Sequence, residues 1–255
     1  MSGTHAPRGG ALVTGAARRI GRALALEAAS LGYDVAVHCR EADADAASLA
    51  AAIEGQGRRA VVLAADLTDD AAIAALTGQA AAAVGPLTLL VNCASLFEDD
   101  RIETLTPASF DAAIAANLRA PILLAQAFAA QAPRDGRALI VNLLDQRVWR
   151  PNPQFFSYAI SKGALWHATQ MLAQALAPTI RVNAIGPGPT LPSIHQDDAA
   201  FTAEAANVLL ERRAEPGEVA AALRYLIDAR SVTGQMIAVD GGQHLAWRTP
   251  DIIGP

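Results

Sequence analysis

Residues 11–22 read Ala-Leu-Val-Thr-Gly-Ala-Ala-Arg-Arg-Ile-Gly-Arg, and this stretch decides the fold. Its apolar start, Ala11–Val13, fits a short buried strand, and the pattern of Ile20–Leu31 fits a helix rich in Ala and Leu. A turn with Gly15 and Gly21 between a strand and a helix lets backbone N–H groups and the helix N-terminus approach an anionic pyrophosphate. The string alone is also compatible with a plain tight turn, but its position after the first strand favours nucleotide binding.

Short apolar runs alternate with longer Ala/Leu-patterned stretches along the rest of the chain. The runs expected to be strands are Ala11–Val13, Asp34–His38, Ala60–Ala64, Leu87–Val91, Ala138–Leu143, Arg181–Ile185 and Gln235–Val239. The stretches expected to be helices are Ile20–Leu31, Ala44–Glu54, Ala71–Val84, Ala108–Ala130, Tyr158–Leu176 and Glu218–Ala229. This alternation favours right-handed crossovers and ligand binding outside the carboxyl ends of the strands. It predicts an α/β fold, a Rossmann-type doubly wound arrangement with a seven-stranded, mainly parallel sheet and helices on both faces.

The length of 255 residues is compatible with two small domains, but no linker rich in Pro, Gly or Ser interrupts the middle of the chain. We therefore expect residues 1–255 to form one domain. One long segment, from Gly186 to about Arg213, opens with Gly-Pro-Gly-Pro and is longer than usual connections. We expect it to be irregular, and residues 187–213 are the candidate for a mobile substrate lid.

Composition narrows the class of partner. The chain is 52% hydrophobic but only 5% aromatic, so its core must be built from Ala, Leu, Val and Ile. The net charge is -5 and no Lys/Arg run occurs, which argues against nucleic acid and anionic membranes and favours a small-molecule partner. Two cysteines cannot form a disulfide framework, and we see neither a secretory signal nor an apolar run near the ~20 residues that span a bilayer. A cytoplasmic location is expected, and no metal site is predicted.

The second predicted strand bears on the choice of nucleotide. It ends at His38, and no carboxylate precedes Glu41 where NAD-specific proteins place one for the ribose 2'-hydroxyl. Arg40 can instead form charge-assisted hydrogen bonds to a 2'-phosphate, which predicts NADP(H), although a lone solvated Arg is the alternative. Asp66 is suited to accept from the adenine amino group or to cap a helix with Thr68. Asn92 is suited to position the ribose or the backbone, or merely to form a turn.

Tyr158 and Lys162 are the candidate catalytic pair. They open a predicted helix four residues apart, so both side chains lie on one face. A phenol has an ordinary pKa near 10, and a neighbouring ammonium is expected to pull that pKa towards neutrality, which suits a proton donor. A Tyr-x-x-x-Lys string alone is usually a partly buried Tyr beside a solvated Lys. Its place after the fifth strand of a nucleotide-binding fold favours the catalytic interpretation.

With these residues assembled, the chain resembles the short-chain dehydrogenase/reductase family along nearly its whole length. The residues that carry the resemblance are Thr14, Gly15, Gly21, Asp66, Leu67, Asn92, Cys93, Ala94, Asn117, Tyr158, Lys162, Pro187, Gly188, Asp240, Gly241 and Gly242. The resemblance implies that Tyr158 donates the proton, Lys162 holds the ribose and Asn117 anchors a water relay. The cofactor-binding residues expected on this basis are Gly15, Arg18, Arg19, Ile20, Gly21, His38, Arg40, Asp66, Leu67, Asn92, Ala94, Lys162, Pro187 and Gly188. A homotetramer is also implied.

Two departures from the family pattern narrow the resemblance. Arg19 replaces the middle glycine of the usual turn, and Asp145 stands thirteen residues before Tyr158, where most members carry Ser. Both features, with Ser95 and Phe97, resemble the pteridine reductase branch. That resemblance implies that Phe97 stacks on the pterin, Ser95 hydrogen-bonds it, and Asp145 delivers protons together with Tyr158. Leu191 is expected to line the substrate pocket.

Alternatives remain open at this point. Asp145 is equally suited to pair with Arg147 or Arg150, and Phe97 to pack in a loop core. A reductase of another carbonyl or imine substrate, such as a 3-oxoacyl thioester, is the second interpretation. A non-catalytic NADP(H)-sensing regulator is the third.

Overall fold

The computed structural model describes residues 7–192 and 196–247. The strands are β1 (Gly9–Val13), β2 (Tyr33–Cys39), β3 (Ala60–Ala64), β4 (Leu87–Asn92), β5 (Ala138–Leu143), β6 (Ile180–Pro187) and β7 (Met236–Val239). The helices are α1 (Arg19–Ser30), α2 (Ala44–Glu54), α3 (Asp70–Val84), α4 (Pro107–Ile114), α5 (Ala120–Gln131), α6 (Phe156–Leu176), α7 (Asp198–Ala206) and α8 (Pro216–Asp228). A π-helical turn η1 (Ala115–Arg119) joins α4 to α5, and η2 (Gln146–Val148) and η3 (Gln243–Leu245) are short 3-10 turns.

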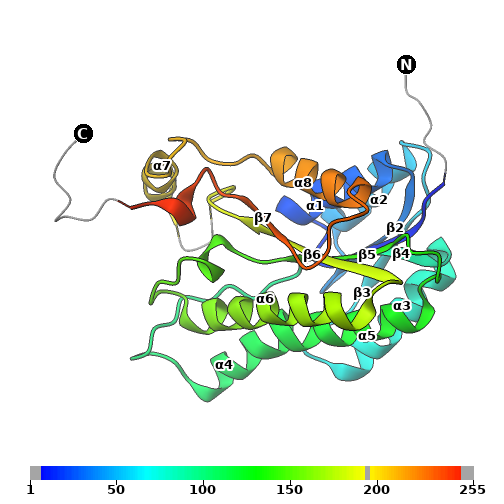
Figure 1. Cartoon of the computed structure of the whole chain (residues 1–255), viewed down its shortest axis with the longest axis horizontal. Helices are drawn as coiled ribbons and strands as arrows, with labels where there is room; N and C mark the ends of the chain where they lie inside the picture. Colours follow the sequence, from blue (N-terminus) through cyan, green and yellow to red (C-terminus); the bar gives the residue numbers. More distant parts are fainter. Residues whose placement is uncertain (1–6, 193–195, 248–255) are drawn as a thin grey trace.

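The seven strands form one parallel sheet in the order β3-β2-β1-β4-β5-β6-β7. Helices α1, α2 and α8 cover one face of this sheet, and α3, α4, α5 and α6 cover the other (Figure 1). Each face has its own apolar cluster, one around Leu24, Leu49 and Leu223 and the other around Leu76, Leu124 and Phe128. The predicted fold class is confirmed.

The chain order reverses between β1 and β4, which lie side by side in the middle of the sheet. In such sheets ligands bind in the crevice outside the carboxyl ends of the strands at this reversal. Val13 is in register with Val91, and Asn92 with Asn142, so the segments that follow β1, β4 and β5 begin close together. The predicted site residues Gly15, Ala94, Ser95, Phe97 and Asp145 lie in these segments.

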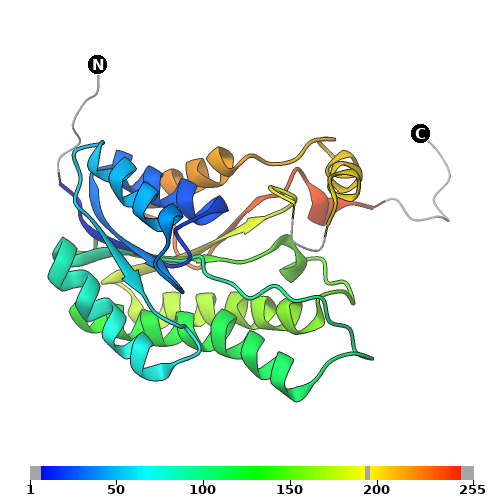
Figure 2. The ribbon, with the colours of Figure 1, turned by 180° about the vertical axis from the view of Figure 1, so that it is seen from behind.

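The segment 108–130, expected as one helix, lies in one continuous helical run, Pro107–Gln131, with the π-helical turn η1 between α4 and α5. One expectation about a later segment is wrong. The segment after Gly186 is not irregular throughout: β6 continues to Pro187, and α7 occupies residues 198–206. Asp197 caps α7 by accepting from the N–H of Ala200 at 2.7 Å, a local signal that the Gly-Pro-rich opening concealed. Both ribbon views place α7 beside η3 (Figures 1 and 2), and Gln243 donates to Glu204 at 3.1 Å there.

The helical run Pro107–Gln131 is long and apolar enough to cross a membrane by length and composition alone. The expectation that no such run occurs was therefore too strict. Leu124 and Phe128 within it are fully buried against the sheet, and Asn117 is fully buried as well. The run is a core helix.

Candidate active site

The turn between β1 and α1 is built on very close backbone approaches. Gly15 has φ +62°, and a Cβ added to it would lie 2.8 Å from the Cα of Ala94. A Cβ on Gly21 would lie 2.1 Å from the carbonyl oxygen of Gly15. The hydroxyl of Thr14 accepts from the N–H groups of Cys93 and Ala94 at 2.9 and 3.0 Å, which joins this turn to the segment after β4. Only residues without side chains fit at positions 15 and 21 in this geometry.

The same turn has the features that a dinucleotide requires. Helix α1 has no acidic residue in its first turn, and no side chain caps its N-terminus at Arg18. Its first N–H groups and its positive dipole end therefore suit a pyrophosphate. The Nδ2 of buried Asn92 donates to Asn142 at 2.9 Å, whereas its Oδ1 is buried without a partner among the described residues. A buried unpaired acceptor is unfavourable unless a ligand supplies a donor, so this atom also fits a bound nucleotide.

Two residues of this turn that were predicted to bind the cofactor, Arg18 and Arg19, have protein partners instead. The guanidinium of Arg18 pairs with Asp43 and Asp45 at the start of α2. Arg19 has φ +54°, the left-handed backbone region that favours the glycine usual at this position. Its guanidinium donates to the carbonyls of Pro192 at 2.8 Å and Leu191 at 3.1 Å. Arg19 therefore ties the turn to the segment after β6, and the Leu191 contact uses its backbone carbonyl.

His38 is a buried support of the turn. Its Nδ1 accepts from the N–H of Gly15 at 3.2 Å, and its Nε2 lies 3.0 Å from the carbonyl oxygen of Ala65. These partners require a neutral ring with its proton on Nε2. Burial lowers the pKa of His38, which agrees with the neutral form. His38 thus links the ends of β1, β2 and β3.

Arg40 and Asp66 lie where the adenosine end of a dinucleotide is expected. Arg40 is exposed and makes no ion pair with any residue in the described ranges. Asp66 accepts from the N–H and the hydroxyl of Thr68, both at 2.8 Å, and these bonds lower the pKa of Asp66. Asp69, not Asp66, caps α3, so the capping alternative for Asp66 is replaced by a tight turn. Leu67 beside it is buried.

Tyr158 and Lys162 lie together at the start of α6, as predicted. The exposed fractions of the two residues are 8% and 2%. The Nζ of Lys162 donates to the carbonyl of Leu143 at 2.7 Å and lies 5.6 Å from the centroid of the Tyr158 ring. The hydroxyl of Tyr158 donates to Oδ2 of Asp145 at 2.9 Å. Asp145 is thus a direct partner of the phenol and not an unrelated loop carboxylate.

The pKa values of this group differ from the expectation for tyrosine. Burial, followed by the Asp145 carboxylate, raises the pKa of Tyr158 well above its ordinary value. Burial also lowers the pKa of Lys162 to about 8 and raises the pKa of Asp145. The expectation that Lys162 depresses the pKa of Tyr158 was therefore wrong, because the desolvated phenol donates to a carboxylate that stabilises its neutral form. Neutral Tyr158 is the form ready to donate a proton.

Asn117 lies in η1 and is fully buried. Its Nδ2 donates to the carbonyl of Leu96 at 2.8 Å and to the hydroxyl of Ser161 at 3.0 Å, and its Oδ1 accepts from Leu96 N–H at 2.7 Å and Ser95 Oγ at 3.2 Å. These bonds explain why a weak helix former stands mid-helix. Asn117 joins the segment after β4 to α6, and Ser95 is one of its partners.

Phe97 lies in an aromatic group beside Tyr158. Its ring stacks on Phe155 with centroids 4.2 Å apart and meets Tyr158 edge-on at 4.7 Å. The guanidinium of Arg147 lies 5.7 Å from the centroid of Phe97 and 5.1 Å from that of Phe155. Sequence reasoning missed Phe155, since its place depends on a left-handed backbone (φ +53°) just before α6. No local pattern signals that conformation for a phenylalanine.

Sequence reasoning also missed the residue that caps α6. Phe155, the N-cap residue just before α6, offers no side-chain hydrogen bond to this helix. Buried Asp100 instead accepts from the N–H of Ser157 at 3.0 Å and from its hydroxyl. Asp100 belongs to the segment that carries Phe97, so this cap holds Phe97 and Tyr158 in one unit. Asp100 and Ser157 are 57 positions apart, so no local motif reveals this cap.

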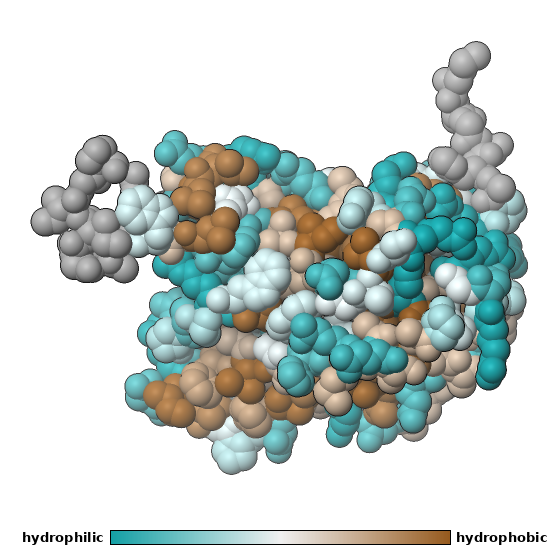
Figure 3. All heavy atoms as spheres, viewed as in Figure 1, coloured by the Kyte–Doolittle hydropathy of each residue, from teal (hydrophilic) through white to brown (hydrophobic). Residues whose placement is uncertain are grey.

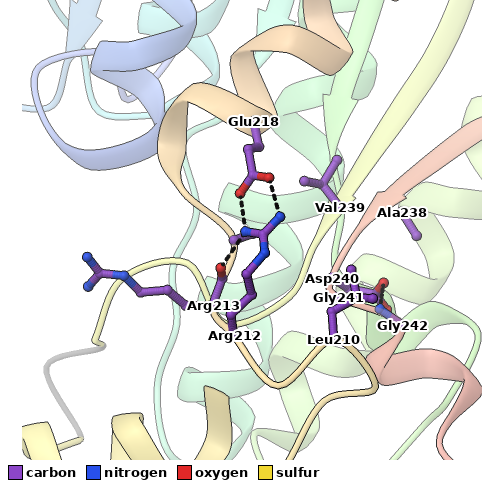
Figure 4. Close-up of a pocket in the computed structure, with 10 residues that line it drawn as sticks. Leu210, Arg212, Arg213, Glu218, Ala238, Val239, Asp240, Gly241 and Gly242 are labelled. Carbon is purple, nitrogen blue, oxygen red and sulfur yellow. Dashed lines mark hydrogen bonds and ion pairs between the residues drawn. The ribbon is translucent and has the colours of Figure 1, made fainter. Parts of the chain in front are cut away.

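The end of β6 completes the site. The N–H of Gly188 donates to Val239 at 3.0 Å, and a Cβ on Gly188 would lie 2.7 Å from the Cα of Asp240. Pro187 and Gly188 therefore sit against the Asp240-Gly241-Gly242 turn. A separate hollow beside this turn contains none of the predicted catalytic residues (Figure 4). Its Arg212 forms two hydrogen bonds with Glu218, at 2.7 and 2.9 Å.

Comparisons with known proteins agree with this arrangement. The family model described as enoyl-(acyl carrier protein) reductase matches residues 15–244. The FolM alternative dihydrofolate reductase 1 of Brucella canis, solved with NADP, is 48% identical, with a TM-score of 0.93 over 98% of this chain and 100% of that one. The Brucella suis protein of the same description, also in complex with NADP, is 49% identical, with a TM-score of 0.92 over 96% and 99%. A short-chain type dehydrogenase/reductase of Picea abies is 32% identical over 248 residues, 91% of each chain.

Proposed function

Because the chain belongs to the short-chain dehydrogenase/reductase family, we propose that it is an NADPH-dependent reductase with Tyr158 as its proton donor. The observation that carries this proposal is the hydrogen bond from buried Tyr158 to partly buried Asp145, beside buried Lys162. The NADP-bound Brucella proteins support the cofactor, as does the unpaired Arg40 at the end of β2. Intact Tyr158 and Lys162 disfavour a purely sensing role.

The cofactor, when bound, supplies the hydride. The residues proposed to hold its pyrophosphate and nicotinamide ribose are the N–H groups at the start of α1, the Oδ1 of Asn92, and Lys162. The turn is shaped by Gly15, Gly21, Ala94 and His38. The other residues proposed to lie around the bound cofactor are Ile20, Leu67, Pro187 and Gly188. Arg18 would serve a phosphate only by sharing or leaving Asp43 and Asp45.

We propose a pteridine, a dihydropterin or dihydrofolate-like compound, as the substrate. Reduction of its C=N bond adds a hydride to the carbon and a proton to the adjacent nitrogen, so a donor must face that nitrogen. Tyr158 would give this proton, and Asp145, hydrogen-bonded to it, would share protons with it as a serine could not. Phe97 would stack on the pterin with the ring face that Phe155 does not cover, or by exchanging its stack on Phe155. Ser95 offers a hydroxyl that must leave Asn117 to bind substrate.

The test is an assay of NADPH oxidation with dihydrobiopterin, dihydromonapterin, dihydrofolate, simple ketones and a 3-oxoacyl thioester. Pterin reduction supports the proposal. Turnover of only ketones or thioesters would remove the pteridine assignment and leave a reductase, the second interpretation. No turnover with any member of the panel would favour the NADP(H)-sensing regulator.

Two variants separate the proposed substrate roles. Phe97→Ala should raise the pterin KM mainly, since stacking holds the ground and transition states alike. Asp145→Ser should lower kcat, because it removes the proton-sharing carboxylate. The matched control is Asp135→Ser, which removes an exposed carboxylate paired with Arg137. Equal kinetic effects of the Phe97 and Asp145 variants would contradict these roles.

The remaining expectations are also proposals. We propose that the chain acts as one cytoplasmic reductase domain over residues 1–255, of which 1–6, 193–195 and 248–255 lie outside the described residues. Within it we propose 187–213 as the substrate lid and Asn117 as the anchor of a proton relay. We also propose a homotetramer, and the surface proposed for contact between copies of the chain is the apolar hollow on α5 and α6 lined by Ile122, Leu123, Leu172 and Leu176. Apolar side chains also gather at the α7 end (Figure 3), where Leu209 and Leu210 are exposed. Light scattering of the purified chain would give its mass, and a monomer would refute the tetramer.

A further inference from the structure

We propose that Arg147 is a positioning residue of the proposed reductase reaction: its guanidinium, held on the rings of Phe97 and Phe155, keeps Asp145 a carboxylate that accepts from Tyr158. This inference rests on the proposed function. It adds a role for a cation that the family pattern did not assign, and it gives Phe155 a role.

The two oxygens of Asp145 have separate partners. Its Oδ2 accepts from the Tyr158 hydroxyl at 2.9 Å, and its Oδ1 accepts from the backbone N–H of Arg147 at 2.8 Å. The second bond closes the tight turn that begins η2, so the backbone of Arg147 is fixed relative to the carboxylate. The Arg147 side chain therefore starts from a defined place beside the catalytic pair.

The guanidinium of Arg147 is held by rings and not by an ion pair. It lies 5.1 and 5.7 Å from the centroids of Phe155 and Phe97, which stack on each other at 4.2 Å. No carboxylate of the described residues lies within 4.0 Å of its nitrogens, and its Nε is buried without an acceptor among them. Cation–π contacts position such a charge without neutralising it. Its positive charge thus remains available to act on nearby groups.

The charge of Arg147 opposes the effect of burial on Asp145. Burial raises the pKa of Asp145, and Arg147 is the strongest opposing group, ahead of Tyr158 and Lys162. Cys93, which follows β4, is a neutral thiol because burial raises its pKa to about 11. On β6 the neighbour of Asp145 is Gly186, which does not titrate. The turn η3, which packs on η2, carries His244, and that ring pairs with Asp240 at 2.6 Å. Lys162 already donates to the carbonyl of Leu143. Arg147 is therefore the cation that sets the pKa of Asp145 most strongly.

The test is the pH profile of kcat for Arg147→Met, Arg147→Lys and the control Arg150→Met. The control also removes one guanidinium charge, that of Arg150, which lies three residues further along the chain and donates to the carbonyl of Gln243. Without Arg147 the pKa of Asp145 rises, so the acid limb of the profile should move to higher pH, by about one unit for the loss of a neighbouring unit charge in a partly buried site. Arg147→Lys should return the limb close to wild type, and Arg150→Met should leave it unchanged.

Phe155→Leu tests the aromatic holder separately. It keeps an apolar side chain but removes the ring nearer the guanidinium, so a smaller shift in the same direction is expected. A carbon NMR titration of the Asp145 carboxyl, assigned with Asp145→Asn, reads the same pKa change without turnover. An unchanged acid limb and an unchanged carboxyl titration in Arg147→Met would overturn the inference, as would an equal shift in Arg150→Met. Failure of pterin reduction alone would overturn only the substrate proposal, because the NMR readout does not depend on it.

Discussion

Gly21→Ala is the sharpest test of the turn between β1 and α1. The added Cβ would lie 2.1 Å from the carbonyl oxygen of Gly15, 2.9 Å from its carbonyl carbon and 3.0 Å from the Cα of Ala16. All three are backbone atoms, so no side-chain rotation relieves the contact. A carbon normally stays about 3.3 Å from such an oxygen, so the backbone must yield by roughly 1 Å.

We expect a double effect from this displacement. Overpacking of this kind destabilises by about 1–3 kcal/mol, and a clash against backbone places the variant at the upper end, near 3 kcal/mol. The N–H groups proposed to bind the pyrophosphate move with the turn, and the loss of two hydrogen bonds to a charged group, at about 1.5 kcal/mol each, should weaken NADPH binding by about 100-fold. Urea unfolding measures the first effect, and a fluorescence titration with NADPH measures the second.

Gly78→Ala is the matched control. Gly78 lies in α3, and a Cβ there meets nothing within 4 Å. The change should stabilise the protein by about 0.5–1 kcal/mol, because Ala is the better helix former, and should leave NADPH binding unchanged. If Gly21→Ala were as stable as the wild type and bound NADPH within twofold, the assignment of this turn would be refuted.

Three further outcomes are expected. Arg40→Asp should invert the preference for NADPH over NADH in steady-state assays, since it removes an attraction for the 2'-phosphate and adds a repulsion; a retained NADPH bias would contradict the role of Arg40. Tyr158→Phe should keep NADPH affinity but lose turnover by about 100-fold or more, the scale of a positioned acid. Undiminished turnover there would mean that another group donates the proton. Because burial lowers the pKa of His38, the unfolded chain binds a proton that the folded chain excludes. The stability from neutral His38 should be complete above about pH 6.5 and decline as the pH falls below it. Urea unfolding at pH 7.5 and 5.5 should therefore show a smaller loss for His38→Gln than for wild type, and equal losses would contradict this.

The sequence by itself determined the fold class and the chemical centre. The spacing of apolar residues differs between strands and helices, and this spacing can be read from a short stretch of sequence without knowing the rest of the fold. Tyr158 and Lys162 share a face because a spacing of four always does so in a helix. The turn residues Gly15 and Gly21 were identifiable because a strand-to-helix turn with close backbone contacts tolerates little else.

Only the tertiary structure decided how these parts meet. The cap of α6 by Asp100 and the bond of His38 to Gly15 join distant segments, so no local pattern encodes them. The stacking of Phe155 depends on a left-handed backbone conformation, which a phenylalanine rarely adopts. The direction of the pKa shift of Tyr158 was mispredicted for the same reason. The spacing shows that a lysine is near, but burial and the hydrogen-bond partner of the hydroxyl decide which charge state is stabilised. Both are set by long-range packing.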